Sequence, residues 1–181
     1  MRADYIAPEI LDHILAALTV QNELAMRVSL ATGLRIDDVL SLYTCQLEQA
    51  KNNRITVIEE KTKKRRRVYI PESLKKQMLA RAGIRYVFES RTDWKKHRTR
   101  QAVWKDLKRA ADAFRVTGKL NVSPHTARKV YAVEAFKKYG KPEKVQQLLQ
   151  HNDAAVTALY LMAEEITLRK MGPLISPLLR K

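Results

Sequence analysis

The sequence predicts one predominantly helical α+β domain in which a small antiparallel β-hairpin packs on helices. Apolar residues recur at helical spacing through most of the chain, whereas a short central stretch is rich in β-branched residues. The 181 residues, 45% of them hydrophobic, are enough for one domain with a buried core and too few for two ordinary domains.

The first third of the chain predicts three helices. Pro8 is well suited to a first helical turn, and apolar residues follow it at helical spacing. A second helix is expected over residues 20–31, because Gly33 is a favourable stop signal beyond it. A short helix is expected over residues 37–42, so Arg35 should lie at a helix boundary.

The middle of the chain predicts the hairpin. Residues 54–58 and 68–70 are mostly β-branched or aromatic, and a polar interval separates them. This interval contains no Gly or Asn, so the sequence leaves the strand register open. A helix is expected over residues 71–82, and residues 86–88 are compatible with one more short strand.

Four further helices are expected in the second half. Ser123 is a suitable N-cap for a helix over residues 124–139, and Gly140 is its stop signal. Two shorter helices are expected over residues 143–150 and 153–164. An amphipathic helix before them, over residues 99–115, has a predicted buried face made of Trp104, Leu107, Ala111 and Phe114.

The net charge of the chain indicates the kind of molecule that it binds. The chain has 35 Lys and Arg against 19 Asp and Glu, a formal charge of +16, which favours a polyanion such as nucleic acid. A membrane-surface protein would share this charge, but no amphipathic helix with bulky apolar anchors stands out. The sequence lacks a secretory h-region and any stretch of transmembrane length, so we expect a cytoplasmic, nucleoid-associated protein with no membrane partner.

Cysteine content limits the chemistry further. Cys45 is the one cysteine, which excludes an internal disulfide and a zinc site built on several cysteines. We expect it to be a small buried residue, and no metal site is predicted.

Two arginine motifs are candidate phosphate sites. In PHTAR, His125 and Arg128 are three residues apart near a helix start, so they share one face near the positive end of the helix dipole. In TGLRIDD, Asp38 lies one turn after Arg35 and can orient its guanidinium, whose planar fork suits phosphate. Taken alone, each motif is also compatible with a solvated polar face or a surface ion pair.

The segment KTKKRRR, residues 61–67, is a candidate DNA-contacting element. Six of its seven residues are basic, and we expect them at the hairpin tip, where they can enter a groove or track a backbone. A solvated charged turn is the alternative, but clustered like charges repel unless an anion relieves them. The candidates for DNA contact are Lys63, Lys64, Arg65, Arg66, Arg67 and Lys129.

His151 and Tyr160 stand nine residues apart in LLQHNDAAVTALY. The histidine is expected between two helices and the tyrosine inside the second. Tyr160 follows Val156 by four residues and so lies on or next to an apolar face. A core tyrosine is therefore the main alternative to a nucleophile at this position.

In this chain order, Arg, Lys, His-x-x-Arg, His and Tyr resemble the active-site set of the tyrosine recombinases, the lambda-integrase-like enzymes. The matching motifs are TGLRIDDVL, the KT of EEKTKKRRRVYIP, SPHTARKVYAVEAF and VQQLLQHNDAAVTALY, and the resemblance runs from about Pro8 to Tyr160. It implies the catalytic-domain fold of that family. The implied catalytic residues are Arg35, Lys61, His125, Arg128, His151 and Tyr160, with Asp38 in support.

The resemblance also implies DNA cleavage and rejoining through a 3′-phosphotyrosine. Arg35 and Arg128 would bind the two non-bridging oxygens of the scissile phosphate. Tyr160 would attack in line, with His125 as the base that removes its proton, while His151 would hydrogen-bond to the phosphate. No cofactor is implied, because the bond energy is kept in the phosphotyrosine.

Lys61 is implied to protonate the departing 5′ oxygen. Lys63 or Lys64 takes this role if the hairpin register slips by two or three residues. Three positions depart from the family pattern: Gln150 stands where Gly is usual, Lys129 stands where many members have His, and the hairpin turn lacks the common Gly. A DNA-binding module without catalysis and a type IB topoisomerase are the alternative functions.

Domain organisation follows from the same resemblance. Residues 1–172 correspond to the catalytic domain, and the amino-terminal core-binding domain of most family members is absent, so we expect a fragment or one of the short members. Residues 173–181 form an apolar tail between prolines, expected to dock on a neighbouring protomer. The implied partners are double-stranded DNA and further copies of the chain assembled on it.

Overall fold

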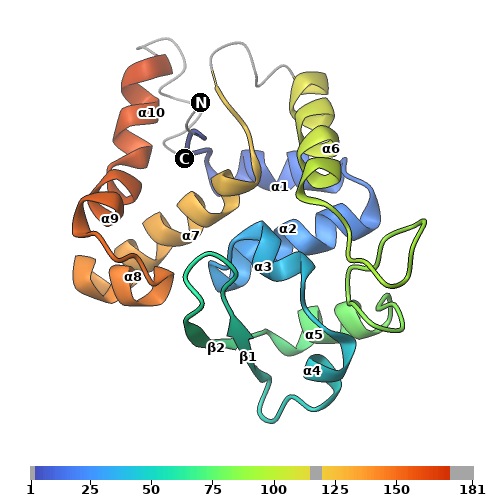
Figure 1. The fold of residues 1–181 in the computed structure, drawn as a ribbon. Coiled ribbons are helices and arrows are strands. Elements are labelled where there is room, and N and C mark those ends of the chain that lie inside the picture. The colour runs from blue at the N-terminus through green and yellow to red at the C-terminus, as the bar shows by residue number, and fades with distance from the viewer. Residues whose placement is uncertain (1–2, 115–119, 172–181) are drawn as a thin grey trace.

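The computed structural model describes residues 3–114 and 120–171 and confirms the predicted fold class (Figure 1). One antiparallel hairpin, β1 (Arg54–Ile58) and β2 (Arg65–Tyr69), interrupts a series of helices. The helices before it are α1 (Pro8–Ala16), α2 (Val20–Thr32), α3 (Ile36–Leu40) and α4 (Thr44–Glu48). Those after it are α5 (Glu72–Leu79), α6 (Arg100–Ala113), α7 (Pro124–Tyr139), α8 (Pro142–Leu149), α9 (Ala154–Leu161) and α10 (Ala163–Met171).

The hairpin register is defined by the pairing of Arg54 with Tyr69 and of Ile58 with Arg65. Exposed and buried residues alternate along both strands, as expected for a hairpin with one face on a core. Residues 59–64 form the connecting loop. Lys63 adopts a left-handed conformation in this loop, with φ 55°, which is the kind of position that favours glycine.

The main core surrounds α2 and α7. These two helices contact each other in the middle of the molecule, with the hairpin below them and α8, α9 and α10 gathered at one side of α7 (Figure 1). Both central helices contribute fully buried residues, such as Val28 and Ala127. A second, smaller cluster joins α7 to α8 and consists of Ala132, Ala135, Val145 and Leu149.

The sequence predicts one helix over residues 153–164, but the structure has two helices here, α9 and α10. α10 is fixed by the amino-terminal segment. The backbone N–H of Tyr5 donates to Thr167 Oγ1 at 3.1 Å, and Lys170 Nζ lies 2.6 Å from Asp4 Oδ2. These contacts join distant parts of the chain, which local periodicity cannot predict.

The buried face of α6 is rotated from the predicted one. Trp104 and Phe114 were expected in the core but are 40% and 49% exposed, while the other two predicted residues are buried. The rotation turns Asp106 inward. Its Oδ2 accepts hydrogen bonds from the Thr19 backbone N–H at 2.9 Å and from Asn22 Nδ2 at 2.7 Å, so a polar anchor at the start of α2 decides the orientation.

Two smaller expectations were wrong. Residues 86–88 form no strand, because Tyr86 makes a single bridge to Tyr43 in a turn rather than pairing with another strand. Cys45 is exposed instead of buried. It lies on the outer side of α4, an unpredicted short helix whose buried residue is Leu47.

Within the described ranges, no helix is long and apolar enough to cross a membrane. The apolar tail predicted at residues 174–179 lies outside the described residues.

The two helix-ending glycines should respond differently to alanine. Gly33 and Gly140 both have left-handed backbones, with φ 67° and 65°. A Cβ at Gly33 would lie 2.5 Å from ring carbons of Tyr131, whereas one at Gly140 would meet nothing within 4 Å. Gly140→Ala should therefore lower the free energy of unfolding by about 1–2 kcal/mol, and Gly33→Ala by about 2–4 kcal/mol because overpacking is added.

Urea denaturation of the two variants measures this difference. Equal losses would contradict the packing role assigned to Gly33.

Candidate active site

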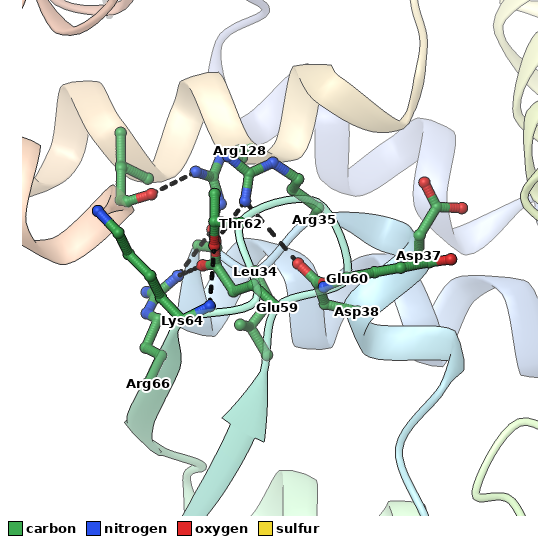
Figure 2. Close-up of polar contacts among 12 residues, drawn as sticks. Leu34, Arg35, Asp37, Asp38, Glu59, Glu60, Thr62, Lys64, Arg66 and Arg128 are labelled. Atoms are coloured by element: carbon green, nitrogen blue, oxygen red, sulfur yellow. Dashed lines mark hydrogen bonds and ion pairs between the residues drawn. The ribbon is translucent and has the colours of Figure 1, made fainter. Parts of the chain in front are cut away.

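Arg35 is positioned by the end of α2 and the start of α3. Gly33 stops α2 in a left-handed conformation, and Arg35 then forms the N-cap of α3. Its Nη1 lies 2.5 Å from Glu59 Oε2 and 4.0 Å from Asp38 Oδ2 (Figure 2). The direct partner of this guanidinium is thus Glu59, and the expected pairing with Asp38 is only a distant ion pair.

Asp38 instead fixes the hairpin loop. Its Oδ1 accepts the backbone N–H of Glu60 at 2.8 Å, and its side chain is buried. Burial raises the pKa of this carboxyl, while the bond from Glu60 lowers it. Asp38 therefore holds the backbone of Glu60, the residue before Lys61.

Glu59 is a central residue that the sequence analysis missed. Its carboxylate has no exposed surface and lies between two guanidiniums, with Arg66 Nη1 3.6 Å from Oε1. Thr62 Oγ1 in the hairpin loop donates to the same carboxylate at 3.0 Å. The signal for this residue was the period of β1, since the inward positions Ile55 and Val57 are followed by position 59.

Arg66, predicted as a DNA contact, does not belong to the exposed basic surface. It occupies an inward position of β2, is 6% exposed, and donates to the carbonyl oxygens of Thr32 and Gly33 at the end of α2. Burial lowers the pKa of its guanidinium. Arg65 and Arg67 also lie in β2 rather than at the tip, although both are exposed.

The three candidate lysines occupy the loop but reach different places. Lys61 lines a pocket with Arg35. Lys63 lines a separate pocket on the side of α4, and Lys64 Nζ donates to Asn152 Oδ1 at 2.7 Å. Lys61 is therefore the lysine that shares a pocket with the first arginine.

Arg128 of α7 is almost fully buried. Its guanidinium donates to the carbonyl oxygens of Gly33 and Leu149. Burial, followed by the charge of Arg35, lowers its pKa to about 10. Figure 2 shows the Arg35 and Arg128 guanidiniums next to each other above the hairpin loop at Thr62.

The two histidines flank this pair of arginines. His125 lies in the first turn of α7 and lines the pocket of about 720 Å³ that contains Arg35 and Lys61. Desolvation and then the charge of Arg128 lower the pKa of His125. His151 lies between α8 and α9, and its Nδ1 is hydrogen-bonded to Thr157 Oγ1 at 3.1 Å. Burial, followed by the charge of Arg128, lowers the pKa of His151 to about 4.

Tyr160 is half-buried on α9. Its ring meets the ring of His151 edge-on, with centroids 5.0 Å apart, and Lys129 Nζ lies 5.7 Å from its centroid. The ring packs against the smaller core cluster but also lines a pocket of about 350 Å³ together with His125 and Lys129. Tyr160 is thus neither a fully buried core residue nor remote from the other candidates.

His125 lines both pockets and joins them into one surface region. On one side are Arg35 and Lys61, and on the other is Tyr160. This arrangement is suited to bind an anion between fixed cations, with a phenol and a neutral imidazole beside it.

Gln150 departs from the family pattern in sequence but not in backbone. It has φ 50° and ψ 42° at the end of α8, a left-handed conformation typical of glycine. Its side-chain Nε2 donates to the Arg65 backbone oxygen at 3.3 Å, so it links the turn before His151 to the hairpin.

The fold matches that of the tyrosine recombinases. The chain belongs to the phage integrase family, whose model matches residues 5–165. The probable integrase/recombinase YoeC of Bacillus subtilis (strain 168) is 28% identical over 144 residues, 76% of this chain and 75% of YoeC. Tyrosine recombinase XerD of Lacticaseibacillus casei is 33% identical over 144 residues, 72% of this chain and 46% of that protein.

Solved structures show the same fold. A lambda integrase dimer bound to a COC′ core site superposes with a TM-score of 0.71 at 17% identity, over 91% of this chain and 49% of that one. XerH site-specific recombinase bound to palindromic difH substrate superposes with a TM-score of 0.68 at 19% identity, over 90% of this chain and 51% of that one. The chain therefore spans about half the length of XerD and of these two structures, and three quarters of YoeC.

The buried Glu59 charge should be essential for stability. Glu59→Ala leaves two guanidiniums without their partner and should lower the free energy of unfolding by about 3–5 kcal/mol. Glu60→Ala, next to it but exposed, should change it by less than about 0.5 kcal/mol. Urea denaturation compares the two, and similar values for both variants would refute the central position of Glu59.

His151 should make stability depend on pH. The folded state holds its pKa near 4, below the unfolded value of about 6.5, so the stabilisation is complete above about pH 6.5 and is lost as pH falls toward 4. His151→Gln removes the titrating group, and its stability should therefore fall less between pH 7 and 4.5.

Urea titrations at several pH values measure this, with His13→Gln on the exposed side of α1 as the matched control. Parallel curves for wild type and His151→Gln would contradict the prediction.

Proposed function

We propose that this chain is the catalytic part of a site-specific DNA recombinase that cleaves and rejoins DNA through a 3′-phosphotyrosine at Tyr160. The observation that carries the proposal is the position of His125, which lines the pocket of Arg35 and Lys61 and also the pocket of Tyr160. Membership of the phage integrase family and the formal charge of +16 support it.

Binding of the scissile phosphate is assigned to the two arginines. Arg128 is held by two backbone carbonyls and Arg35 by the Glu59 carboxylate, so both guanidiniums are oriented before DNA arrives. Fixed cations in a partly desolvated site stabilise a developing negative charge without reorganising during the reaction.

Cleavage then exchanges one phosphoester for another. The Tyr160 oxygen forms a bond to phosphorus while the bond to the 5′ oxygen breaks. The phenol proton passes to His125, whose lowered pKa keeps it neutral near pH 7 and able to accept a proton. Lys61 donates a proton to the leaving 5′ oxygen, and rejoining to a new 5′-hydroxyl reverses these steps.

Double-stranded DNA is the proposed partner. Lambda integrase and XerH, which share the fold, were solved bound to a core site and to difH substrate. The exposed cations Lys61, Lys63, Lys64, Arg65 and Arg67, together with the partly exposed Lys129, are the proposed contacts to the backbone. Assembly on DNA through the tail at residues 173–181 remains a proposal from sequence.

Covalent trapping tests the proposed reaction. A pool of nicked suicide duplexes, randomised on both sides of the nick, releases a short fragment after attack and leaves the protein on DNA. Wild type should form an adduct that survives denaturing gels, and Tyr160→Phe should form none. Arg128→Lys should reduce the adduct by about 10²–10³-fold, the usual effect of losing one transition-state donor.

Tyr139→Phe is the matched control, because Tyr139 is an exposed tyrosine outside the site. An adduct with Tyr160→Phe would refute the assigned nucleophile. Tight DNA binding by wild type with no adduct would instead indicate a DNA-binding regulator.

A further inference from the structure

A stacked pair of tyrosines lies beside the hairpin loop and has no role in the proposed reaction. Tyr43 and Tyr86 meet through a backbone bridge, and their ring centroids are 4.9 Å apart with planes inclined by 24°. His97 contacts Tyr86 edge-on at 5.4 Å. Tyr86 is buried while Tyr43 is 38% exposed, so Tyr86 supports the ring of Tyr43 from behind.

These rings form a wall of a pocket of about 310 Å³. Lys63 and Glu60 from the hairpin loop line the same pocket. The Arg85 guanidinium lies 5.9 Å from the centroid of Tyr43 and 5.4 Å from that of Tyr86. The pocket thus combines an aromatic surface, one carboxylate and two nearby cations.

This pocket adjoins the candidate active site. Glu60 lines both this pocket and the pocket of Arg35 and Lys61. Lys61 and Lys63 are two residues apart in the loop, and each lines one of these two pockets. Because one residue lines both pockets and successive nucleotides of one strand rise only about 3.4 Å, a strand held at Arg35 could reach this pocket within a few nucleotides.

We propose that this pocket receives one unstacked nucleobase of the DNA strand held at Arg35 and Lys61. The proposal rests on the proposed function and extends it. Stacking on an aromatic side chain contributes about 1–3 kcal/mol per base, and the exposed ring of Tyr43 offers such a surface. A volume near the lower limit of ligand pockets, about 300 Å³, suits a single base rather than a base pair.

The charges favour a base over a bare phosphate. Glu60 would repel a phosphate inside the pocket, but its carboxylate can accept a hydrogen bond from the amino group of cytosine or adenine. Lys63 and Arg85 are then available for the phosphates on either side of the inserted base.

A double-mutant cycle tests this inference by combining substitutions of Tyr43 with abasic sites in the DNA. The duplexes are recovered from the covalent-trapping pool, and single abasic sites are placed at each position near the nick. Binding is measured with Tyr160→Phe protein, which leaves the DNA uncut. Tyr43→Leu should weaken binding of intact DNA by about 5–50-fold, in line with the loss of one stacking contact, and Tyr43→Phe should not.

At one abasic position, Tyr43→Leu should have no further effect, because the base that it contacts is gone. An equal loss on every abasic duplex would indicate a backbone contact and overturn the proposal, as would no loss on intact DNA. Tyr139→Leu is the control for an exposed tyrosine elsewhere.

The outcome is separable from that of the proposed function. Failure of wild type to bind or trap DNA refutes recombination itself. Normal trapping by wild type with no dependence on Tyr43 refutes only the base pocket.

Discussion

The burial of the Glu59 carboxylate is the constraint on which the candidate site depends. A carboxylate with no exposed surface is tolerated only when it is paired. Its partners come from two different elements, Arg35 at the start of α3 and Arg66 in β2. Because Arg66 also donates to the Thr32 carbonyl at the end of α2, one buried charge joins the hairpin to the helical body and orients the first arginine.

The cations of the site outweigh its carboxylates. Burial, followed by the charge of the neighbouring Arg35, lowers the pKa of Arg128 to about 10. The pKa of His151 falls to about 4 by burial and the same cations. Depressed pKa values for cations and imidazoles together mean that an anion entering the site would relieve an electrostatic cost already present in the fold.

The sequence predicts the features that are determined by neighbouring residues, but not those that depend on contacts between distant parts of the chain. Ser123 and Gly140 mark their helix ends because capping and left-handed stops act within one turn. Glu59 and Arg66 were not recognised as a buried pair, since each looks like part of an exposed charged run until both strands are placed. The rotation of α6 likewise depends on Asp106 finding Thr19 across the fold, and no periodicity contains that information.

Two departures from the family pattern place a residue other than glycine at a left-handed position of the backbone. A non-glycine residue in the left-handed region costs about 1–2 kcal/mol, and both Gln150 and Lys63 adopt it. Gln150 compensates by donating to the Arg65 backbone, a contact that a glycine could not make. Because His151 follows directly, this bond holds its turn against β2. The ion pair of Glu59 with Arg35 and the neutral bond from Gln150 to Arg65 thus join the hairpin to the helical body at the two ends of the loop that carries Lys61.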